Sequence, residues 1–218
     1  MTQNTSSAVM QRRSDPHDSL DDFPTPPWAT RALCERLPIW NFPWRTAHQV
    51  VREPAANRGH MVRPLSEYFG QVEAADVHDY GAGFPVRDYL FGADPAPADW
   101  TITNPPFRLA EQFIERALRT SRVGVAVIVR SAFLEGVGRH KRLFDLHPPV
   151  AILQFTERVV MHKGRLSPNG STATAYCWIV WKTNQAWLAT GEFPRPEATM
   201  FDWIPPSRKA LEKPGDYQ

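Results

Sequence analysis

The sequence predicts an α/β, Rossmann-like fold with a doubly wound, mostly parallel seven-stranded sheet and an antiparallel edge hairpin. Three observations predict it. Short apolar strands alternate along the chain with amphipathic helical segments. Residues 48–76 fit a strand, a tight turn, a helix and a second strand that ends at an acidic residue, the order of a mononucleotide-binding half-sheet. A continuously apolar strand at 124–129 is typical of strands covered by helices on both faces.

The elements predicted in the first half of the chain are a helix at 28–37, a strand at 48–53, a helix at 59–69, and strands at 71–76 and 99–103. The first helix is expected to start after Thr25, which can act as its cap, with prolines in the first turn. Pro54 is expected to end the first strand because proline lacks the N–H that a central strand needs.

The elements predicted in the second half are a helix at 109–118, a strand at 124–129, a helix at 135–146, and strands at 150–155 and 172–181. Phe113 with Ala117, and Ile114 with Leu118, have the i, i+4 spacing of one buried helix face. A polar, glycine-containing loop joins the last two strands. We expect these strands to form an antiparallel pair at the edge of the sheet.

Composition indicates one domain of ordinary size, since 42% of the 218 residues are hydrophobic. We expect a disordered arm at 1–22, the domain at 23–185 and a Pro-rich extension at 186–218. The apolar stretches 123–129 and 173–181 are shorter than the roughly 20 residues that cross a bilayer. The first 20 residues are too polar for a signal peptide, so a cytoplasmic protein without a membrane partner is expected.

Charge and cysteine content exclude some classes of site. The formal net charge of +2 is nearly balanced, so any nucleic-acid-binding face must be local. Cys34 and Cys177 have neither metal-ligand spacing nor a disulfide pattern. We expect both to be buried free thiols in a reducing compartment, and we expect no metal.

Four polar residues fall at predicted strand ends or in the loops that follow: Glu53, Asp76, Asp88 and Asn104. Ligands of doubly wound sheets bind beyond the carboxyl ends of the strands, so these residues should meet in one crevice. Asp76 is placed to accept hydrogen bonds from ribose hydroxyls. Taken singly, each residue also fits an ordinary turn or helix cap.

The turn from Glu53 to Met61 has the residue types needed for close approach of the backbone to a polar ligand. Ala55, Ala56 and Gly59 are small, and Asn57 tolerates the left-handed region better than most residues. The absence of a Gly-x-Gly-x-x-Gly pattern argues against a dinucleotide site. Alone, this segment also fits an ordinary loop.

The most specific segment is Asn104-Pro105-Pro106-Phe107, at the end of a predicted strand. Its prolines fix the backbone and remove two donors, so the Pro105 carbonyl and the Asn104 side-chain oxygen can both accept hydrogen bonds. An exocyclic amine has two hydrogens for these acceptors, and holding both would aim the nitrogen lone pair at a methyl donor. Phe107 can stack on an extruded base, worth about 1–3 kcal/mol. The alternative is a Pro-Pro turn with a core phenylalanine.

These motifs together resemble the S-adenosylmethionine-dependent amino-group DNA methyltransferases, specifically the N6-adenine type. The resemblance runs from about Phe23 to Trp181 and rests on Thr-Pro-Pro at a helix start, Glu-Pro-Ala-Ala-x-x-Gly-x-Met, and Asn-Pro-Pro-Phe in that order. It implies a class I methyltransferase fold, S-adenosylmethionine as cofactor and DNA as partner.

The resemblance also implies a role for each matching position. Thr25 and Pro26 would lie against the methionine part of the cofactor, and Glu53 to Gly59 with Ala55 would form the cofactor turn. Asp76 would contact the ribose and Asp88 the cofactor adenine. Asn104, Pro105, Pro106 and Phe107 would hold the target amine, and Asn104 would also contact the cofactor. Asn rather than Ser at position 104 favours adenine N6 over cytosine N4.

Two departures from the family pattern stand out. The family usually has glycine where Asn57 stands, which puts the details of the turn in question. After the last predicted strand only residues 182–218 remain, too few for a separate target-recognition domain. Recognition of DNA would then come from loops, from a partner or from very short target sequences.

Two basic segments are candidates for phosphate contact. The inter-strand loop 157–171, with Arg158, Lys163 and Arg165, is the better one because its length and glycines suit a mobile binding segment. Residues 139–142 fit a solvated helix face better. Three alternatives stay open: methylation of a protein glutamine amide, methylation of an RNA base, or a non-catalytic module that binds cofactor and nucleic acid.

Overall fold

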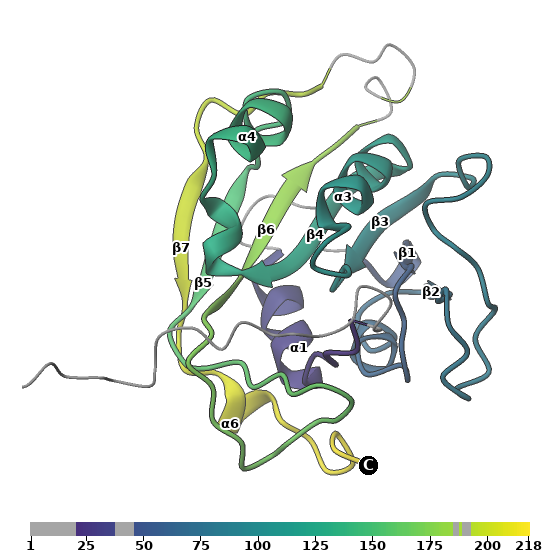
Figure 1. Ribbon diagram of the computed structural model, residues 1–218, viewed down its shortest axis with the longest axis vertical. Helices are drawn as coiled ribbons and strands as arrows, with labels where there is room; N and C mark the ends of the chain where they lie inside the picture. The colour runs from purple at the N-terminus through teal and green to yellow at the C-terminus, as the bar shows by residue number, and fades with distance from the viewer. Residues whose placement is uncertain (1–20, 38–45, 185–187, 189–192) are drawn as a thin grey trace, which may run out of the picture.

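The computed structural model describes residues 21–37, 46–184, 188 and 193–218 (Figure 1). The arm predicted at 1–22 lies outside these residues except for its last two. Within the described part of the chain, one sheet has the strand order β2-β1-β3-β4-β6-β5-β7. Its strands are β1 (Val50–Glu53), β2 (Gln71–Ala74), β3 (Ala98–Thr103), β4 (Ser121–Arg130), β5 (Ala151–Phe155), β6 (Tyr176–Lys182) and β7 (Met200–Ile204).

One strand, β6, runs against the direction of the others. It pairs antiparallel with β4 and with β5, whereas all other pairings in the sheet are parallel. The chain goes from β1 outward to β2 and then returns to the other side of β1 as β3. The predicted doubly wound, mostly parallel sheet of seven strands is confirmed.

The helical elements are short and lie on both faces of the sheet (Figure 1). They are α1 (Pro27–Arg36), η2 (Thr46–His48), α2 (Val62–Leu65), α3 (Ala110–Arg119), η3 (Ser131–Leu134), α4 (Val137–Arg139), the π-helical turn η4 (His140–Phe144) and α6 (Arg208–Leu211). Their packing explains the apolar run in β4. Val125, Val127 and Val129 face α3, while Ala126 and Ile128 share a buried cluster with α1. Both predicted free thiols, Cys34 and Cys177, are buried and unpaired.

The edge of the sheet differs from the prediction. The antiparallel pair β5–β6 is present, but β7 lies beyond β5, so the pair is not at the edge. β7 comes from the segment predicted as a Pro-rich extension, and it pairs in parallel with β5 from Ala151↔Met200 to Phe155↔Ile204. The boundary expected at residue 185 therefore does not separate this strand from the domain.

Three local predictions need correction. The segment 59–69, predicted as one helix, is helical only at α2 (Val62–Leu65) and forms turns on either side. Pro64 within the segment limits the length of the helix. The helix predicted at 135–146 is α4 followed by the π-helical turn η4. Thr25 does not cap α1, since Pro26 occupies the N-cap position and no side chain caps the helix.

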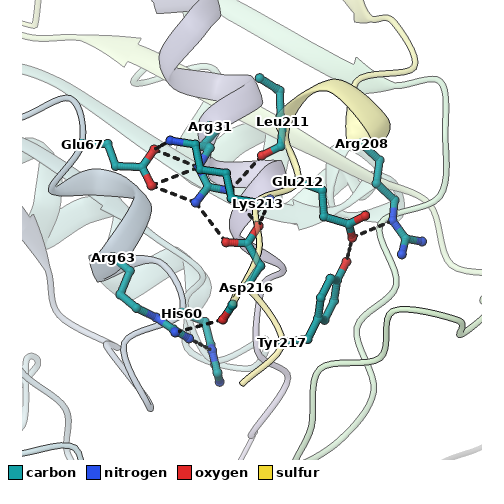
Figure 2. A network of polar contacts seen from close by, with 11 residues as sticks. Arg31, His60, Arg63, Glu67, Arg208, Leu211, Glu212, Lys213, Asp216 and Tyr217 are labelled. Carbon is teal, nitrogen blue, oxygen red and sulfur yellow. Dashed lines mark hydrogen bonds and ion pairs between the residues drawn. The ribbon is translucent and has the colours of Figure 1, made fainter.

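Polar contacts tie the end of the chain to α1 (Figure 2). Arg31 is buried and donates from Nε and Nη2 to the Glu67 carboxylate, and from Nη1 to Asp216 Oδ2 at 2.7 Å. Asp216 is also buried, and Lys213 Nζ reaches Glu67 Oε2 at 2.7 Å. The segment after β7 is therefore anchored against the helix that begins next to the predicted cofactor motif.

Among the described residues, no helix has both the length and the apolar character needed to cross a membrane.

Candidate functional site

The centre of the candidate site is the point where the sheet reverses its winding, between β1 and β3. Glu53 ends β1 and is completely buried. Its Oε1 accepts hydrogen bonds from Thr103 Oγ1 at 2.6 Å and from the Ala55 N–H at 2.9 Å. These contacts join the carboxyl ends of two adjacent strands, where ligands of doubly wound sheets bind.

The Glu53 carboxyl has a raised pKa and therefore holds its proton more tightly than an exposed glutamate does. Burial raises its pKa to about 8, although the hydrogen bonds from Thr103 and Ala55 oppose the rise. Its second oxygen, Oε2, has no hydrogen-bond partner among the described residues. Glu53 therefore has a structural role in the wall of the site: it orients the turn by accepting a hydrogen bond from the Ala55 N–H.

A cavity of about 560 Å³ opens beside these strand ends, within the range typical of small-molecule sites. Six of the predicted site residues line it: Ala55, Asp76, Asp88, Asn104, Pro106 and Phe107. Five others do not form its lining: Thr25, Pro26, Glu53, Gly59 and Pro105. The predicted crevice is thus formed by residues of three separate loops.

The turn after β1 adopts the conformation that its sequence suggests. Asn57 has φ of 50°, in the left-handed region, and its N–H donates to Asp76 Oδ2 at 2.9 Å. Gly59 has φ of 83°, and a Cβ there would lie 3.0 Å from the Phe84 ring. Asn57 and Gly59 therefore both occupy positions of positive φ in this turn, which asparagine and glycine tolerate better than other residues do.

Asp76 is oriented by two backbone amides. Besides the bond from Asn57, its Oδ1 accepts from the His78 N–H at 2.9 Å, and the residue is only 8% exposed. A carboxylate fixed in this way keeps lone pairs for a ligand and loses little freedom on binding. Asp88 lies farther along the same β2–β3 loop, where its Oδ1 accepts a hydrogen bond from the Leu90 N–H.

Asn104 has its amide oriented by the N-terminal segment. Its Nδ2 donates to the Phe23 carbonyl oxygen at 2.8 Å and lies 3.8 Å from Met161 Sδ. Its Oδ1 is shielded from solvent and has no hydrogen-bond partner within the described part of the chain. The amide thus presents an unused acceptor at the end of β3.

Phe107 is already partly covered. Its ring lies 5.4 Å from the Phe23 ring, and the Arg130 guanidinium lies 4.1 Å from its centroid. Its N–H donates to Asp21 Oδ2 at 2.6 Å. A flat ligand stacked on Phe107 must therefore displace or flank one of these neighbours.

Asp21 and Asp22 are site residues that were not predicted from the sequence. Asp21 and Phe23 line the cavity. Asp22 is buried, and Oδ1 accepts from Asn57 Nδ2 at 2.7 Å. Their only signal in the sequence is their position just before the Thr-Pro-Pro motif, because these contacts span at least 35 residues along the chain.

His60 also lines the cavity and stays neutral. Burial, together with the nearby Arg63 and Arg58 charges, lowers the pKa of His60 to about 4. Its Nδ1 lies 3.0 Å from Arg63 Nη2 and accepts that hydrogen bond (Figure 2). An uncharged ring in this wall does not repel a cationic ligand.

The two basic segments differ in their surroundings. Arg158, Lys163 and Arg165 are exposed on the β5–β6 loop. That loop reaches the site because the Gly164 N–H donates to the Asp22 carbonyl oxygen at 2.8 Å. In the other segment, Arg139 and Arg142 both pair with Glu111 of α3. The interpretation of 139–142 as a helix face fits these pairs.

Known proteins match this chain in structure. No protein-family model and no curated protein sequence matches the chain. Solved structures do match, among them a Listeria monocytogenes protein named as a class I S-adenosylmethionine-dependent methyltransferase. That likeness has a TM-score of 0.62 and 12% identity, and covers 90% of this chain and 69% of the other.

The names of two further matching structures refer to an RNA methyltransferase and to a restriction-modification system. One is named as an RNA methyltransferase from Pyrococcus horikoshii, with TM-score 0.55, 16% identity, and coverage of 78% of this chain and 92% of the other. The second is the methyltransferase subunit of a type I restriction-modification system from Streptococcus thermophilus, with TM-score 0.53, 12% identity, and coverage of 75% and 45%. At such identities a likeness establishes architecture alone. The chain therefore has the Rossmann-like fold of class I S-adenosylmethionine-dependent methyltransferases.

Proposed function

We propose that this protein transfers a methyl group from S-adenosylmethionine to the exocyclic amino group of a nucleic-acid base, namely N6 of adenine in DNA. The observation that carries the proposal is the state of Asn104. The Phe23 carbonyl takes its amide N–H, which leaves Oδ1 as an unused acceptor beside Pro105 and Pro106. A buried acceptor without a partner is costly, so a donor from a ligand would relieve that cost.

The residues beside the cavity fit the proposed cofactor. Asp76 offers a fixed carboxylate for the ribose hydroxyls, Asp88 is available for the adenine, and the Ala55–Asn57 turn forms the adjoining wall. Thr25 and Pro26 are buried next to Phe23 in the sequence and are proposed to support the methionine end. When bound, S-adenosylmethionine supplies a methyl group activated by its sulfonium charge.

The chain's own contribution to the reaction is to position the amine. We assign Asn104 Oδ1 as the acceptor for one amine hydrogen. The Pro105 carbonyl oxygen is proposed for the other, although Pro105 does not line the cavity in this structure. Two such hydrogen bonds reduce delocalisation of the nitrogen lone pair and aim it at the methyl group. The methylated nitrogen then loses one proton to water. Pro106 keeps the backbone rigid, and Phe107 supports the base by stacking, with Arg130 or Phe23 yielding space.

A nucleic-acid substrate is supported by two further observations. The exposed basic side chains of Arg158, Lys163 and Arg165 are on the loop that contacts the site through Gly164. Among the solved structures of the same fold are the restriction-modification subunit and the protein named as an RNA methyltransferase. Phosphate contacts from this loop would position the substrate without reading its sequence.

A methyl-transfer assay tests the proposal against its alternatives. Purified protein is incubated with S-adenosylmethionine labelled in the methyl group and, separately, with duplex DNA, single-stranded DNA, RNA and a release-factor-type protein that offers a glutamine amide. We expect label in DNA. Label only in RNA or protein would move the activity to that substrate, while binding of cofactor and DNA without transfer would indicate a non-catalytic module.

A further inference from the structure

The three residues Asp21–Phe23 contact three separate segments of the candidate site. Asp21 accepts a hydrogen bond from the Phe107 N–H, and the Phe23 carbonyl accepts one from Asn104. Between them, Asp22 contacts the turn after β1 with its side chain and the β5–β6 loop with its backbone. In this segment the proposed cofactor turn, amine-holding motif and DNA-binding loop are joined.

The side chain of Asp22 supports the strained part of the turn. Its Oδ1 accepts from Asn57 Nδ2 at 2.7 Å, and its Oδ2 accepts from Arg58 Nη1 at 3.0 Å. Positive φ is less favourable for a non-glycine residue, so the hydrogen bond to Asp22 stabilises Asn57 in this conformation. Because Asn57 in turn donates its N–H to Asp76, the Asp22 carboxylate helps fix the residue proposed to bind the ribose.

The backbone of Asp22 supports the basic loop. Its carbonyl oxygen accepts from the Gly164 N–H at 2.8 Å, between Lys163 and Arg165. Gly164 has φ of 76°, and its Cβ position would lie 3.9 Å from Asp22 Oδ2. The loop is thus held next to the buried Asp22 carboxylate, which is itself held by the turn.

We propose that Asp22 is a positioning residue that couples cofactor binding to DNA binding. The proposal rests on the function proposed above. A ligand that orders the Ala55–Asn57 turn also orders Asp22, so that less conformational entropy is lost when the Gly164 loop binds DNA. Because the coupling free energy is shared by the two sites, DNA must tighten cofactor binding by the same factor by which the cofactor tightens DNA binding.

The coupling is measured as a ratio of affinities. S-Adenosylhomocysteine, which has no methyl group to transfer, serves as the cofactor probe, and short duplexes of random sequence serve as the DNA probe. Fluorescence anisotropy gives the DNA dissociation constant with and without saturating S-adenosylhomocysteine, and calorimetry gives the reciprocal ratio. For the wild type we expect both ratios to be about fivefold or more, as is typical of coupled sites.

Two variants remove the contact from opposite sides. Asp22→Ala deletes the carboxylate, and Asn57→Gly deletes the amide while it retains freedom to adopt positive φ. Asp22→Ala should lower the ratio to about one, and Asn57→Gly, which keeps the contact from Arg58 to Asp22, should lower it below the wild-type value. Melting temperatures show that both variants are folded. Asp145→Ala, an exposed aspartate outside the cavity, serves as the matched control and should keep the wild-type ratio.

The outcomes separate this inference from the proposed function. A wild type that binds neither S-adenosylhomocysteine nor DNA would contradict the proposed function itself. A wild-type ratio of one, or a wild-type ratio retained by either variant, would overturn the role of Asp22 alone. Reduced affinity for both ligands with an unchanged ratio would likewise show a purely structural residue and overturn the coupling.

Discussion

Thr103 Oγ1 donates a hydrogen bond of 2.6 Å to Glu53 Oε1, and this buried contact joins the ends of β3 and β1. It places the polar residues that follow both strands next to one another. The same environment makes Glu53 a titrating group within the wall of the site, because burial outweighs its two hydrogen bonds.

Glu53 predicts a pH dependence of stability. Its pKa rises from 4.5 to about 8 on folding, so the folded state binds the proton more tightly than the unfolded state. Its contribution to the free energy of unfolding is therefore fully present below about pH 4.5, decreases as the pH rises toward 8, and is lost above pH 8. The total loss is on the order of a few kcal/mol. Glu53→Gln should remove this decrease.

Urea unfolding across this pH range checks the Glu53 prediction. The difference between wild type and Glu53→Gln should change steadily in favour of the variant as the pH rises, because glutamine cannot ionise. Glu135→Gln, at an exposed position, controls for the loss of a surface carboxylate. A difference that stays constant with pH would reject a raised pKa for Glu53.

Asp76→Ala should weaken cofactor binding. Hydrogen bonds to a charged group contribute about 1.5–3 kcal/mol, which corresponds to a loss of roughly tenfold to a hundredfold in affinity. Calorimetry with S-adenosylhomocysteine measures the change. Asp79→Ala is the matched control, since Asp79 is an exposed acid of the same loop that does not line the cavity. Equal affinity in Asp76→Ala and wild type would reject the ribose assignment.

Asp216→Ala should destabilise the fold although it lies almost at the end of the chain. It removes a buried partner of Arg31 and leaves that guanidinium with Glu67 and the Leu211 carbonyl (Figure 2). Breaking a buried ion pair costs about 3–5 kcal/mol, and the remaining partners of Arg31 should place the loss at the lower end. Chemical denaturation measures it, and a loss no larger than that of Asp145→Ala would refute the anchoring role.

The basic loop should determine how DNA binding responds to salt. Each phosphate contact contributes about 0.9 to the slope of log affinity against log salt concentration. Replacing Lys163 and Arg165 with alanine should therefore lower the slope by up to about 2. The matched double variant Lys141→Ala/Lys209→Ala changes two exposed lysines elsewhere and should leave the slope unchanged. An unaltered slope in the loop variant would place the phosphate contacts elsewhere.

The parts of the fold that depend on local pattern could be predicted from the sequence. The apolar run in β4 indicated a strand covered on both faces. Of the four polar residues expected to meet in one crevice, Asp76, Asp88 and Asn104 line the cavity, whereas Glu53 is buried and does not line it. Asn57 was expected to tolerate positive φ, and it has φ of 50°. Each of these features follows from residue type and spacing within a short segment.

Features that depend on contacts between distant segments could not be predicted in this way. β7 is only five residues long, prolines surround it, and its pairing partner β5 lies about 50 residues away in the sequence. Its apolar run Met200–Phe201 and Trp203–Ile204 was the available signal. Asp22 gives no such signal, because its partners Asn57 and Gly164 come from different loops.

The central claim is that Asn104 holds an adenine amine for methylation, and analysis of the methylated nucleoside tests it most directly. DNA treated with protein and S-adenosylmethionine is digested to nucleosides and examined by mass spectrometry, with Asn104→Ala in parallel. We predict N6-methyladenine with the wild type and none with Asn104→Ala, whose S-adenosylhomocysteine affinity stays within about threefold of wild type. Wild-type levels of methylation by Asn104→Ala, or a modified nucleoside other than N6-methyladenine, would contradict the account.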